Sequence, residues 1–415
     1  MTNSSLVFED DISQTWVQEC SDLRDLERNI QLFEFEEKLK TINIDFEFRV
    51  LNRITMTNVH AANMVPVDDF MFGKNRVANY TPFTKTQVLL QPPGCETGAT
   101  VHPTKKPKGS KEAQRRKSTE ALLPLTTEKH KKSLPNAISK MRFEEEESSP
   151  QEEVDEQVVY DPSEWYINAS FVRHSFCAEM PDSLIITQFP RLSTLRDFFS
   201  MLQQKTVRQI VMLCNSNEKE IMEEDCYSLK SPSIVTVAHF TCKTIDLDSS
   251  EFMSVKKLVI QSNASEQARW DEFSITQYKF KQWEDFGVIE EKHFPTFFQA
   301  VVRIHSEFMK NCEEQVDRWD KRMLIHCRAG IGRSGCFAAI FFIYDYLIYL
   351  KALLNSDRSI NPKEDQRFQL SVFGTTRKLR ECRWGAVDKP RQYFLIYQFT
   401  AYMIKAIFPE VKSDN

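Results

Sequence analysis

The sequence predicts an α/β fold, because strand and helix signals are mixed from residue 158 almost to the end of the chain. Short apolar runs typical of buried strands occur at 184–186, 210–213, 234–240, 255–260 and 323–325. Helical spacing of apolar residues over 297–308 predicts an amphipathic helix, and we expect further helices over 336–350 and 392–404. No internal repeat accompanies these signals.

The organisation before residue 158 is less uniform. Apolar residues recur at helical spacing over 11–40, which predicts an N-terminal helical extension over 1–40. Residues 41–92 are mixed and end in a strand-like run at 87–90, and we assign them to the first part of the main domain. Residues 93–157 are basic and then acidic with few aromatic residues, a composition that predicts a disordered insertion. Residues 158–410 form the main part of the domain.

Composition and charge exclude some classes of function. The net charge of -5 gives no general attraction for nucleic acid. Ten cysteines without CxxC pairs, and an acidic N-terminal stretch in place of a basic export signal, predict free thiols in a reducing, cytoplasmic setting. The apolar run at 336–350 is short for a bilayer and contains Asp345, so we expect a buried helix and no membrane span.

The segment that carries chemistry reads IHCRAGIGRSG, from Ile325 to Gly335. A short apolar strand runs into Cys327, and a long helix begins at about Arg333. Glycine in the intervening loop permits a backbone in which successive N–H groups point inward, and the helix N-terminus adds partial positive charge. Arg333 can grip two oxygens of a phosphate with its planar guanidinium. The pattern therefore predicts a phosphate cradle. The loop residues expected to line it are Arg328, Ala329, Gly330, Ile331 and Gly332.

A nucleophile stands inside this cradle. Positive surroundings favour the thiolate of Cys327 over the thiol, and the thiolate is the reactive form. Ser334 can donate its hydroxyl to the sulfur, both as thiolate and as leaving group. We expect His326 to orient the loop through hydrogen bonds and not to react. The loop differs from the ATP-binding GxxxxGK[ST] pattern, because it has no lysine and places a cysteine where phosphorus would be attacked.

HCRAGIGRSG resembles the HCxxGxGR[ST] signature of the cysteine-dependent protein tyrosine phosphatases. Other segments follow the order of the non-receptor, phosphotyrosine-specific branch. These are YINAS at 166–170, TQFP at 187–190, VML at 211–213 followed by Glu218, and a late stretch from 379 to 393. The resemblance covers about 74–92 and 160–405. It implies a highly twisted mixed β-sheet flanked by helices, a role in signalling, phosphotyrosine-containing proteins as partners, and neither metal nor organic cofactor.

The resemblance also assigns the proton donor. The stretch from Trp283 to Val288 is similar to the mobile WPD loop of the family, which makes Asp285 the general acid and later the general base. Trp283 and Glu218 are implied as supporting residues. Gln392 matches the second of two late glutamines and is implied as a catalytic residue.

Several positions depart from the family pattern. Glu284 replaces the proline of the acid loop, so closure of the loop is expected to cost more. Val77, in the KNRVAN segment at 74–79, stands where the family has a tyrosine that walls the phosphotyrosine pocket. Asp388 replaces the first late glutamine, and Glu223 stands at about the place of a lysine. Both acidic residues oppose anion binding, and Arg328 offsets part of that loss.

Three functions remain open at this point. The first is a hydrolase that cleaves phosphotyrosine through a phosphocysteine, since nucleophile, arginine, hydroxyl and acid are all present. The second is a pseudophosphatase that binds phosphotyrosine proteins without turnover, as the departures at Val77, Glu284, Asp388 and Glu223 would allow. The third is a phosphatase of wider specificity, because loss of an aromatic wall would admit phosphoserine or lipid phosphates.

Overall fold

The fold is known from a computed structural model, which describes residues 29–56, 63–66, 69–77, 80–91, 165–173, 183–214, 218, 233–262, 272–313 and 322–409. All of these residues belong to one unit, formed by Met1–Pro93 and Tyr160–Asn415. The expected helix at 11–28, the expected insertion at 93–157 and Glu223 lie outside the described residues.

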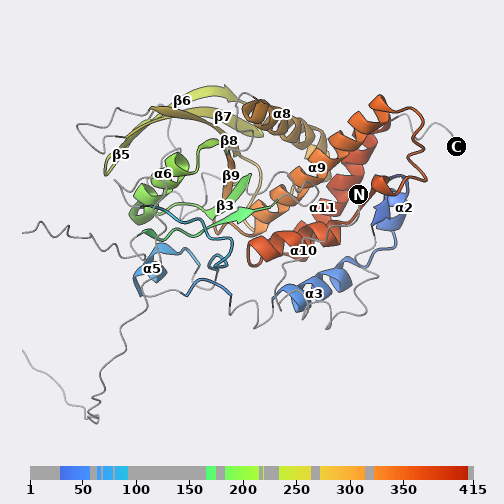
Figure 1. Ribbon diagram of the computed structural model, residues 1–415, viewed down its shortest axis with the longest axis horizontal. Coiled ribbons are helices and arrows are strands. Elements are labelled where there is room, and N and C mark those ends of the chain that lie inside the picture. The colour runs from blue at the N-terminus through green and yellow to red at the C-terminus, as the bar shows by residue number, and fades with distance from the viewer. Residues whose placement is uncertain are drawn as a thin grey trace, which may run out of the picture. The chain divides into compact units, whose positions relative to one another are not determined.

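An eight-stranded mixed sheet runs through the described residues (Figure 1). Its order is β2 (Ala169–Val172), β3 (Leu184–Gln188), β9 (Arg322–Cys327), β4 (Val207–Met212), β8 (Phe273–Phe280), β7 (Met253–Ser262), β6 (Phe240–Ser249) and β5 (Ser233–Val237). The pairs β3–β9, β9–β4 and β4–β8 are parallel, and the other pairs are antiparallel. The predicted mixed α/β sheet is therefore confirmed. The strands at its centre are buried on both faces, as parallel strands usually are.

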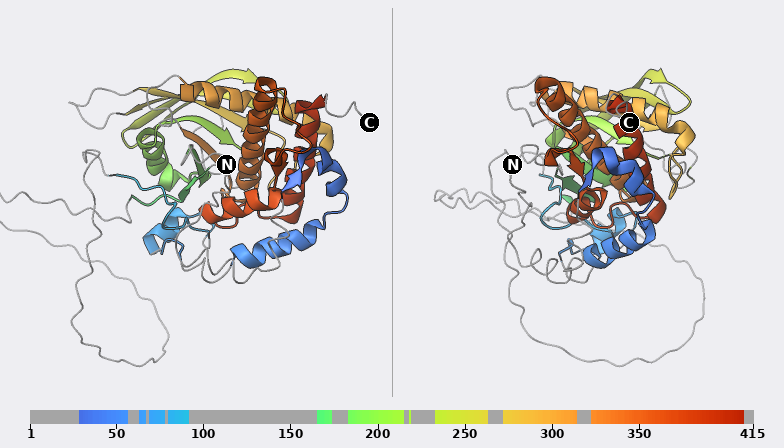
Figure 2. Two further views of the ribbon diagram at one scale, coloured as in Figure 1. Left: turned by 45° about the vertical axis from the view of Figure 1, so that its right-hand side comes forward. Right: turned by 90° about the vertical axis from the view of Figure 1, so that its right-hand side faces the viewer.

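Helices cover both faces of this sheet. On β4, Val211 shares its register with Tyr278, whose hydroxyl contacts Glu307 of α8 (Phe294–Glu313). The next residue, Met212, shares its register with His326, whose ring packs against Phe198 of α6 (Leu195–Gln204). Because successive side chains of a strand point to opposite faces, α6 and α8 lie on opposite sides of the sheet. On the α8 side follow α9 (Gly332–Ser356), α10 (Val372–Cys382) and α11 (Pro390–Ile407), which pack against one another (Figure 2).

The helix α9 is the one described helix that is long and apolar enough to cross a membrane by length and composition. It packs within the fold, however, and every residue from Gly335 to Tyr344 is buried. The interrupting Asp345 pairs with His305 of α8, with 2.6 Å between Oδ1 and Nε2. The expected buried helix is confirmed for this first part. Beyond Tyr344 the helix exposes one side, and Tyr349 is 47% exposed.

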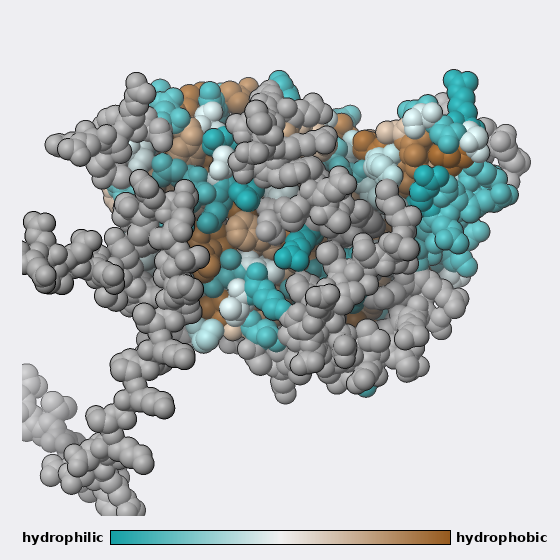
Figure 3. All heavy atoms as spheres, in the orientation of Figure 1, coloured by the Kyte–Doolittle hydropathy of each residue, from teal (hydrophilic) through white to brown (hydrophobic). Residues whose placement is uncertain are grey.

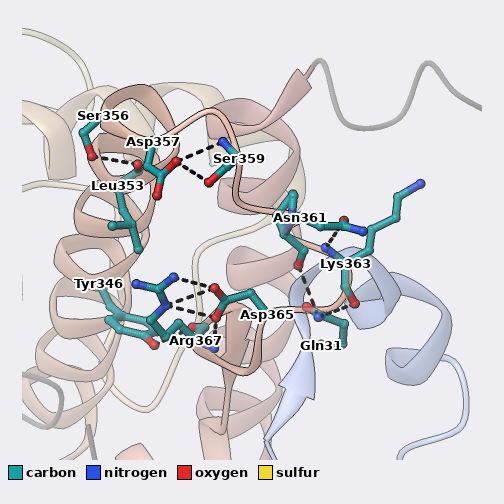
Figure 4. A network of polar contacts seen from close by, with 11 residues as sticks. Gln31, Tyr346, Leu353, Ser356, Asp357, Ser359, Asn361, Lys363, Asp365 and Arg367 are labelled. Carbon is teal, nitrogen blue, oxygen red and sulfur yellow. Dashed lines mark hydrogen bonds and ion pairs between the residues drawn. The ribbon is translucent and has the colours of Figure 1, made fainter.

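The N-terminal segment differs from the expected continuous helix. Ile30–Gln31 forms a two-residue strand, β1, which pairs antiparallel with β10 (Gln369–Leu370). Among the described residues, helical structure begins with the 3-10 turn Leu32–Glu34 and α2 (Phe35–Leu39). The Gln31 amide donates to the carbonyl of Lys363 at 2.9 Å, within the polar loop that follows α9 (Figure 4). A long-range partner therefore overrides the local helical preference at residues 30–31.

The helix α3 (Ile44–Thr55) ties this N-terminal segment to the C-terminal helices. The buried Arg380 of α10 donates to Asn52 Oδ1 at 2.7 Å and to Thr55 Oγ1 at 3.0 Å. On the same helix, buried Glu47 accepts hydrogen bonds of 2.8 Å from Tyr393 and Tyr397 of α11. Figures 1 and 2 show α3 beside α10 and α11.

Two predicted strands have different limits in the structure. The run 234–240 is a hairpin, with β5 and β6 joined by a turn in which Ala238 has φ +51°. The run 87–90 forms an isolated bridge from Gln87 to Ser170. Elements not foreseen are β2, most of β6, β8, β10, α3, α6, α10 and α5 (Asp69–Lys74). On the face seen in Figure 3, hydrophilic residues gather toward the right-hand end, and apolar ones appear only in small patches.

Glu47 makes stability depend on pH. Burial raises the pKa of its carboxyl above the ordinary value of 4.5, although the hydroxyls of Tyr397 and Tyr393 act in the opposite direction. The folded state therefore holds the Glu47 proton more tightly than the unfolded state. This contribution to stability is complete below pH 4.5 and is lost as pH rises through the raised folded pKa. We expect Glu47→Gln to remove this decrease in the free energy of unfolding with rising pH, as measured by urea unfolding from pH 4 to pH 8.

Glu37→Gln is the matched control, because the Glu37 side chain is 75% exposed. It should keep the pH dependence of the wild-type protein. Parallel stability curves for wild type and Glu47→Gln would show that Glu47 does not carry the effect.

Candidate active site

The loop from Cys327 to Gly332 connects the central strand β9 to α9. Gly330 has φ +68°, and a Cβ at this position would lie 2.2 Å from the carbonyl oxygen of Thr187 on β3. Within the described part of the chain, no hydrogen bond uses the backbone N–H groups of Ala329, Gly330 or Ile331. The loop thus combines a buried cysteine, 3% exposed, with unpaired amides at a helix N-terminus, an arrangement suited to an anion.

Buried groups hold the loop in this shape. The guanidinium of Arg383 is fully buried and donates to the carbonyls of Gly330 at 3.2 Å and Ala329 at 3.4 Å. Burial lowers the pKa of Arg383 to about 10, so it remains a cation at neutral pH. His326 is buried below the loop, and burial lowers its pKa to about 3 although a hydrogen bond with the backbone of Cys327 opposes this. Its imidazole is therefore neutral, which fits an orienting role.

Arg333 is the most constrained charge of the site, with 1% of its surface exposed. Glu218 pairs with it in a bidentate geometry, with Nη1–Oε1 and Nη2–Oε2 distances of 2.6 and 3.0 Å. Nη1 also donates to the carbonyl of Trp283 at 2.9 Å. Burial disfavours the charge, but Glu218 raises the pKa of Arg333 above its ordinary value. Its Nε–H has no partner among the described residues and remains able to donate to a bound anion.

Asp285 reaches the same arginine from another segment. Its Oδ1 lies 2.8 Å from Nη2 of Arg333, and its Oδ2 lies 3.5 Å from Nη1 of Arg328. The turn that carries it is closed by the Gly287 amide, which donates to the carbonyl of Glu284 at 3.0 Å. The indole of Trp283 donates to the carbonyl of Gly287 at 3.1 Å. Glu284, which stands where the family has proline, is exposed, and its presence does not prevent Asp285 from reaching Arg333.

The segment before α11 forms another side of the site. Val387 has φ +63°, which is unusual for a β-branched residue. Its amide donates to the carbonyl of Ile331 at 3.2 Å, and its own carbonyl accepts from Arg380 at 2.7 Å. Asp388 follows and pairs with Lys389, with 2.9 Å between Oδ2 and Nζ. The negative charge of Asp388 is therefore balanced by its neighbour, although the sequence alone predicted that this charge would oppose anion binding.

Each of the three residues of the KNR segment makes a hydrogen bond or ion pair with another part of the chain. Buried Lys74 pairs with Asp197 of α6 at 2.9 Å, and Asn75 accepts a hydrogen bond of 3.0 Å from the hydroxyl of Tyr166. The backbone amide of Arg76 donates to the Gln188 side chain at 2.8 Å. These contacts place the following residue, Val77, at the mouth of the site.

A cavity of about 240 Å³ unites these segments. Predicted residues that line it are Val77, Asp285, Cys327, Arg328, Ala329, Ile331, Gly332, Arg333, Asp388 and Gln392. Predicted residues that support it from outside are Gly330, His326, Glu218 and Trp283. The buried hydroxyl of Ser334 makes no hydrogen bond with the sulfur of Cys327 or with any other described residue, contrary to the expected contact.

Three lining residues were not predicted, namely Tyr80, Phe286 and Lys389. Lys389 lies over the ring of Phe286, with its Nζ 5.2 Å from the ring centroid. In the sequence, Phe286 follows Asp285 and Lys389 follows Asp388, which could have suggested that they lie near the site. Adjacency in the sequence does not show, however, which side chains face the cavity. Arg383 was missed because nothing local marks it as buried. Among the described residues, no group of three or more His, Cys, Asp or Glu side chains is placed to hold a metal ion.

Comparison with known proteins agrees with this geometry. Receptor-type tyrosine-protein phosphatase alpha of Mus musculus is 26% identical over 238 residues, which are 57% of this chain and 25% of the relative. Tyrosine-protein phosphatase non-receptor type 12 of Homo sapiens is 26% identical over 243 residues, or 58% of this chain and 27% of the relative. The chain thus matches only about a quarter of the length of these curated relatives.

A solved structure and a family model complete the comparison. The structure of PTPN18 in complex with HER2-pY1196 phosphor-peptides superposes with a TM-score of 0.54 at 17% identity. The match covers 87% of this chain and 92% of that one, and it shows a shared fold. The model of the family described as protein-tyrosine phosphatase matches residues 138–402, more than half of the sequence. The chain belongs to the protein-tyrosine phosphatase family.

Proposed function

We propose that this protein hydrolyses phosphotyrosine through a phosphocysteine formed on Cys327. The observation that carries the proposal is the convergence of Cys327 and Asp285 on the buried Arg333 within one cavity. Family membership supports the reaction class. The unpaired amides of the cysteine loop supply donors for the phosphate oxygens.

In the proposed first step, the thiolate of Cys327 attacks phosphorus and the bond from phosphorus to the tyrosyl oxygen breaks. The incoming phosphate takes over donors of Arg333 and so frees the Asp285 side chain, which in its protonated form gives its proton to the departing oxygen and becomes a carboxylate. In the second step, water attacks the phosphocysteine, Asp285 accepts a proton from that water, and the sulfur–phosphorus bond breaks. Gln392, whose side chain lies against Gly332, is positioned beside the water in this scheme. The unpaired hydroxyl of Ser334 is available to the leaving sulfur.

We do not favour the pseudophosphatase alternative. It rested on departures at Val77, Glu284, Asp388 and Glu223, and Glu223 lies outside the described residues. The side chain of Glu284 is exposed while Asp285 still reaches Arg333, and Asp388 is paired with Lys389. The surroundings of these two departures support turnover.

The wider role remains part of the proposal. We propose a cytoplasmic signalling enzyme that acts on phosphotyrosine-containing proteins, supported by non-receptor relatives such as type 12 and by the phosphopeptides named in the PTPN18 structure. We also propose that 41–92 and 158–410 together form the catalytic domain, with an N-terminal extension at 1–40 and a charged insertion at 93–157.

Replacement of the nucleophile tests the reaction itself. Cys327→Ser should lower turnover of a phosphotyrosine peptide by on the order of 10⁴-fold or more, the scale expected when a covalent nucleophile is lost. Binding of the peptide should survive, because the cradle remains. Steady-state kinetics and calorimetric titration measure the two effects. A wild-type protein that binds the peptide but turns it over no faster than Cys327→Ser would be a pseudophosphatase.

Replacement of the acid tests the proton donor. Asp285→Asn should slow hydrolysis of phenyl phosphate by about 10²–10⁴-fold, because phenolate then leaves unprotonated. The loss should be much smaller for 2,4-dinitrophenyl phosphate, whose leaving group needs no proton. Glu284→Gln is the matched control, since this neighbouring carboxylate is exposed, and it should change neither rate strongly. Equal losses for both substrates with Asp285→Asn would exclude the acid role.

Variants of Asp388 and Lys389 test whether the lysine offsets the negative charge of the aspartate near the bound phosphate. Lys389→Met should leave the carboxylate of Asp388 unpaired near the phosphate and weaken peptide binding by about 3–10-fold at low salt. The double variant Lys389→Met/Asp388→Asn should restore most of the affinity. Titrations in the Cys327→Ser background measure these effects without turnover. Wild-type affinity in Lys389→Met would show that the pair does not matter for binding.

A further inference from the structure

Tyr80 carries the second aromatic ring of the cavity, and the first belongs to Phe286. The two residues come from different parts of the molecule. Phe286 is 46% exposed and lies on the acid loop, whereas Tyr80 is partly buried and lies in the segment that follows KNR. The nearby Val77, from the same segment, contributes only an aliphatic surface.

Two hydrogen bonds hold the backbone amide and carbonyl of Tyr80. Its amide donates to the carbonyl of Val77 at 3.3 Å, which closes a turn that brings both side chains to the cavity. Its carbonyl accepts a hydrogen bond of 2.7 Å from the side chain of Asn168. The turn is thereby anchored to the residue that precedes strand β2.

The ring of Tyr80 occupies space that is left free because residue 385 is glycine. Gly385 has φ +70°, and a Cβ at that position would lie 2.8 Å from Cε1 of Tyr80 and 3.4 Å from Cγ2 of Ile331. A larger residue at 385 would therefore displace the ring. One edge of the Tyr80 ring therefore lies close to the backbone of Gly385, and both Tyr80 and Ile331 line the cavity.

The polar end of Tyr80 faces the charged rim. Burial raises the pKa of its hydroxyl, and the charge of Asp388 adds to that effect while Lys389 and Arg380 oppose it. The hydroxyl is therefore protonated at neutral pH. An uncharged aromatic ring therefore lines the same cavity as Cys327.

We propose that Tyr80 is a specificity-determining residue, whose ring contacts the aryl group of phosphotyrosine in place of an aromatic side chain at position 77. This inference rests on the proposed phosphotyrosine function of the same cavity. An aromatic pair adds stabilisation beyond the area that it buries, and an alkyl phosphate or free phosphate cannot gain it. Tyr80 should thus raise affinity for phosphotyrosine over phosphoserine and inorganic phosphate.

The test compares three probes in the Cys327→Ser background, namely a phosphotyrosine peptide, the same peptide with phosphoserine, and inorganic phosphate. Tyr80→Leu keeps apolar volume but removes the ring, and should weaken the phosphotyrosine peptide by about 3–10-fold, the scale of one aromatic contact. Affinity for inorganic phosphate should stay within about twofold, since phosphate touches only the cradle. Tyr80→Phe, which keeps the ring, should restore phosphotyrosine binding. Urea unfolding checks that each variant is folded.

Val77→Ala is the matched control, because it trims a neighbour in the same turn and the same cavity without removing a ring. Its effect on the phosphotyrosine peptide should be smaller than that of Tyr80→Leu. The inference is overturned if Tyr80→Leu weakens all probes equally, which would indicate a structural role, or if it weakens none of them. If the Cys327→Ser protein binds inorganic phosphate but not the phosphotyrosine peptide, the proposed function fails as well, so the two failures are distinguishable.

Discussion

The buried guanidinium of Arg333 is the constraint on which the rest of the site depends. A cation that is 1% exposed has lost nearly all its hydration and must be compensated by nearby partners. The chain supplies the carboxylate of Glu218 from one segment, and the carbonyl of Trp283 and the carboxylate of Asp285 from a second segment. One charge therefore joins these two segments to the loop that begins at Cys327. Arg333 itself lies in the first turn of α9, directly after the loop that begins at Cys327.

Two further buried arginines extend this frame away from the cavity. Arg383 holds carbonyls of the cysteine loop, and Arg380 holds the carbonyls of Ala386 and Val387 beside Asp388. Arg380 also reaches Asn52 and Thr55, so the N-terminal helix α3 is joined to the segment that lines the cavity. Burial lowers the pKa of Arg380 to about 10, which leaves it charged at neutral pH and costly to leave unpaired. The N-terminal helix thus braces the site through one side chain.

The sequence was most informative where chemistry requires a contiguous pattern. The loop from Cys327 to Arg333 contains nucleophile, amides and arginine within a few residues, so its geometry follows from local rules, and the mixed sheet around it was also foreseen. The strand Ile30–Gln31 was mistaken for helix because its partner lies more than 300 residues later, at β10. The sequence likewise did not indicate that the Tyr80 side chain lines the cavity, since this depends on the space beside Gly385, more than 300 residues later. Spacing cannot report contacts made between distant segments.

The departures from the family pattern acquire a different meaning once their neighbours are known. Compared with the family pattern, Val77 lacks the aromatic ring that walls the pocket, and Asp388 carries an additional negative charge. Each difference, taken alone, opposes binding of an aryl phosphate. In the folded chain, Val77 shares its turn with Tyr80, and Asp388 is paired with the adjacent Lys389. Each change has a compensating residue at the same cavity, within three positions of it in the sequence. An uncharged ring and a paired carboxylate therefore lie at the positions where the sequence alone suggested a missing ring and an unpaired charge.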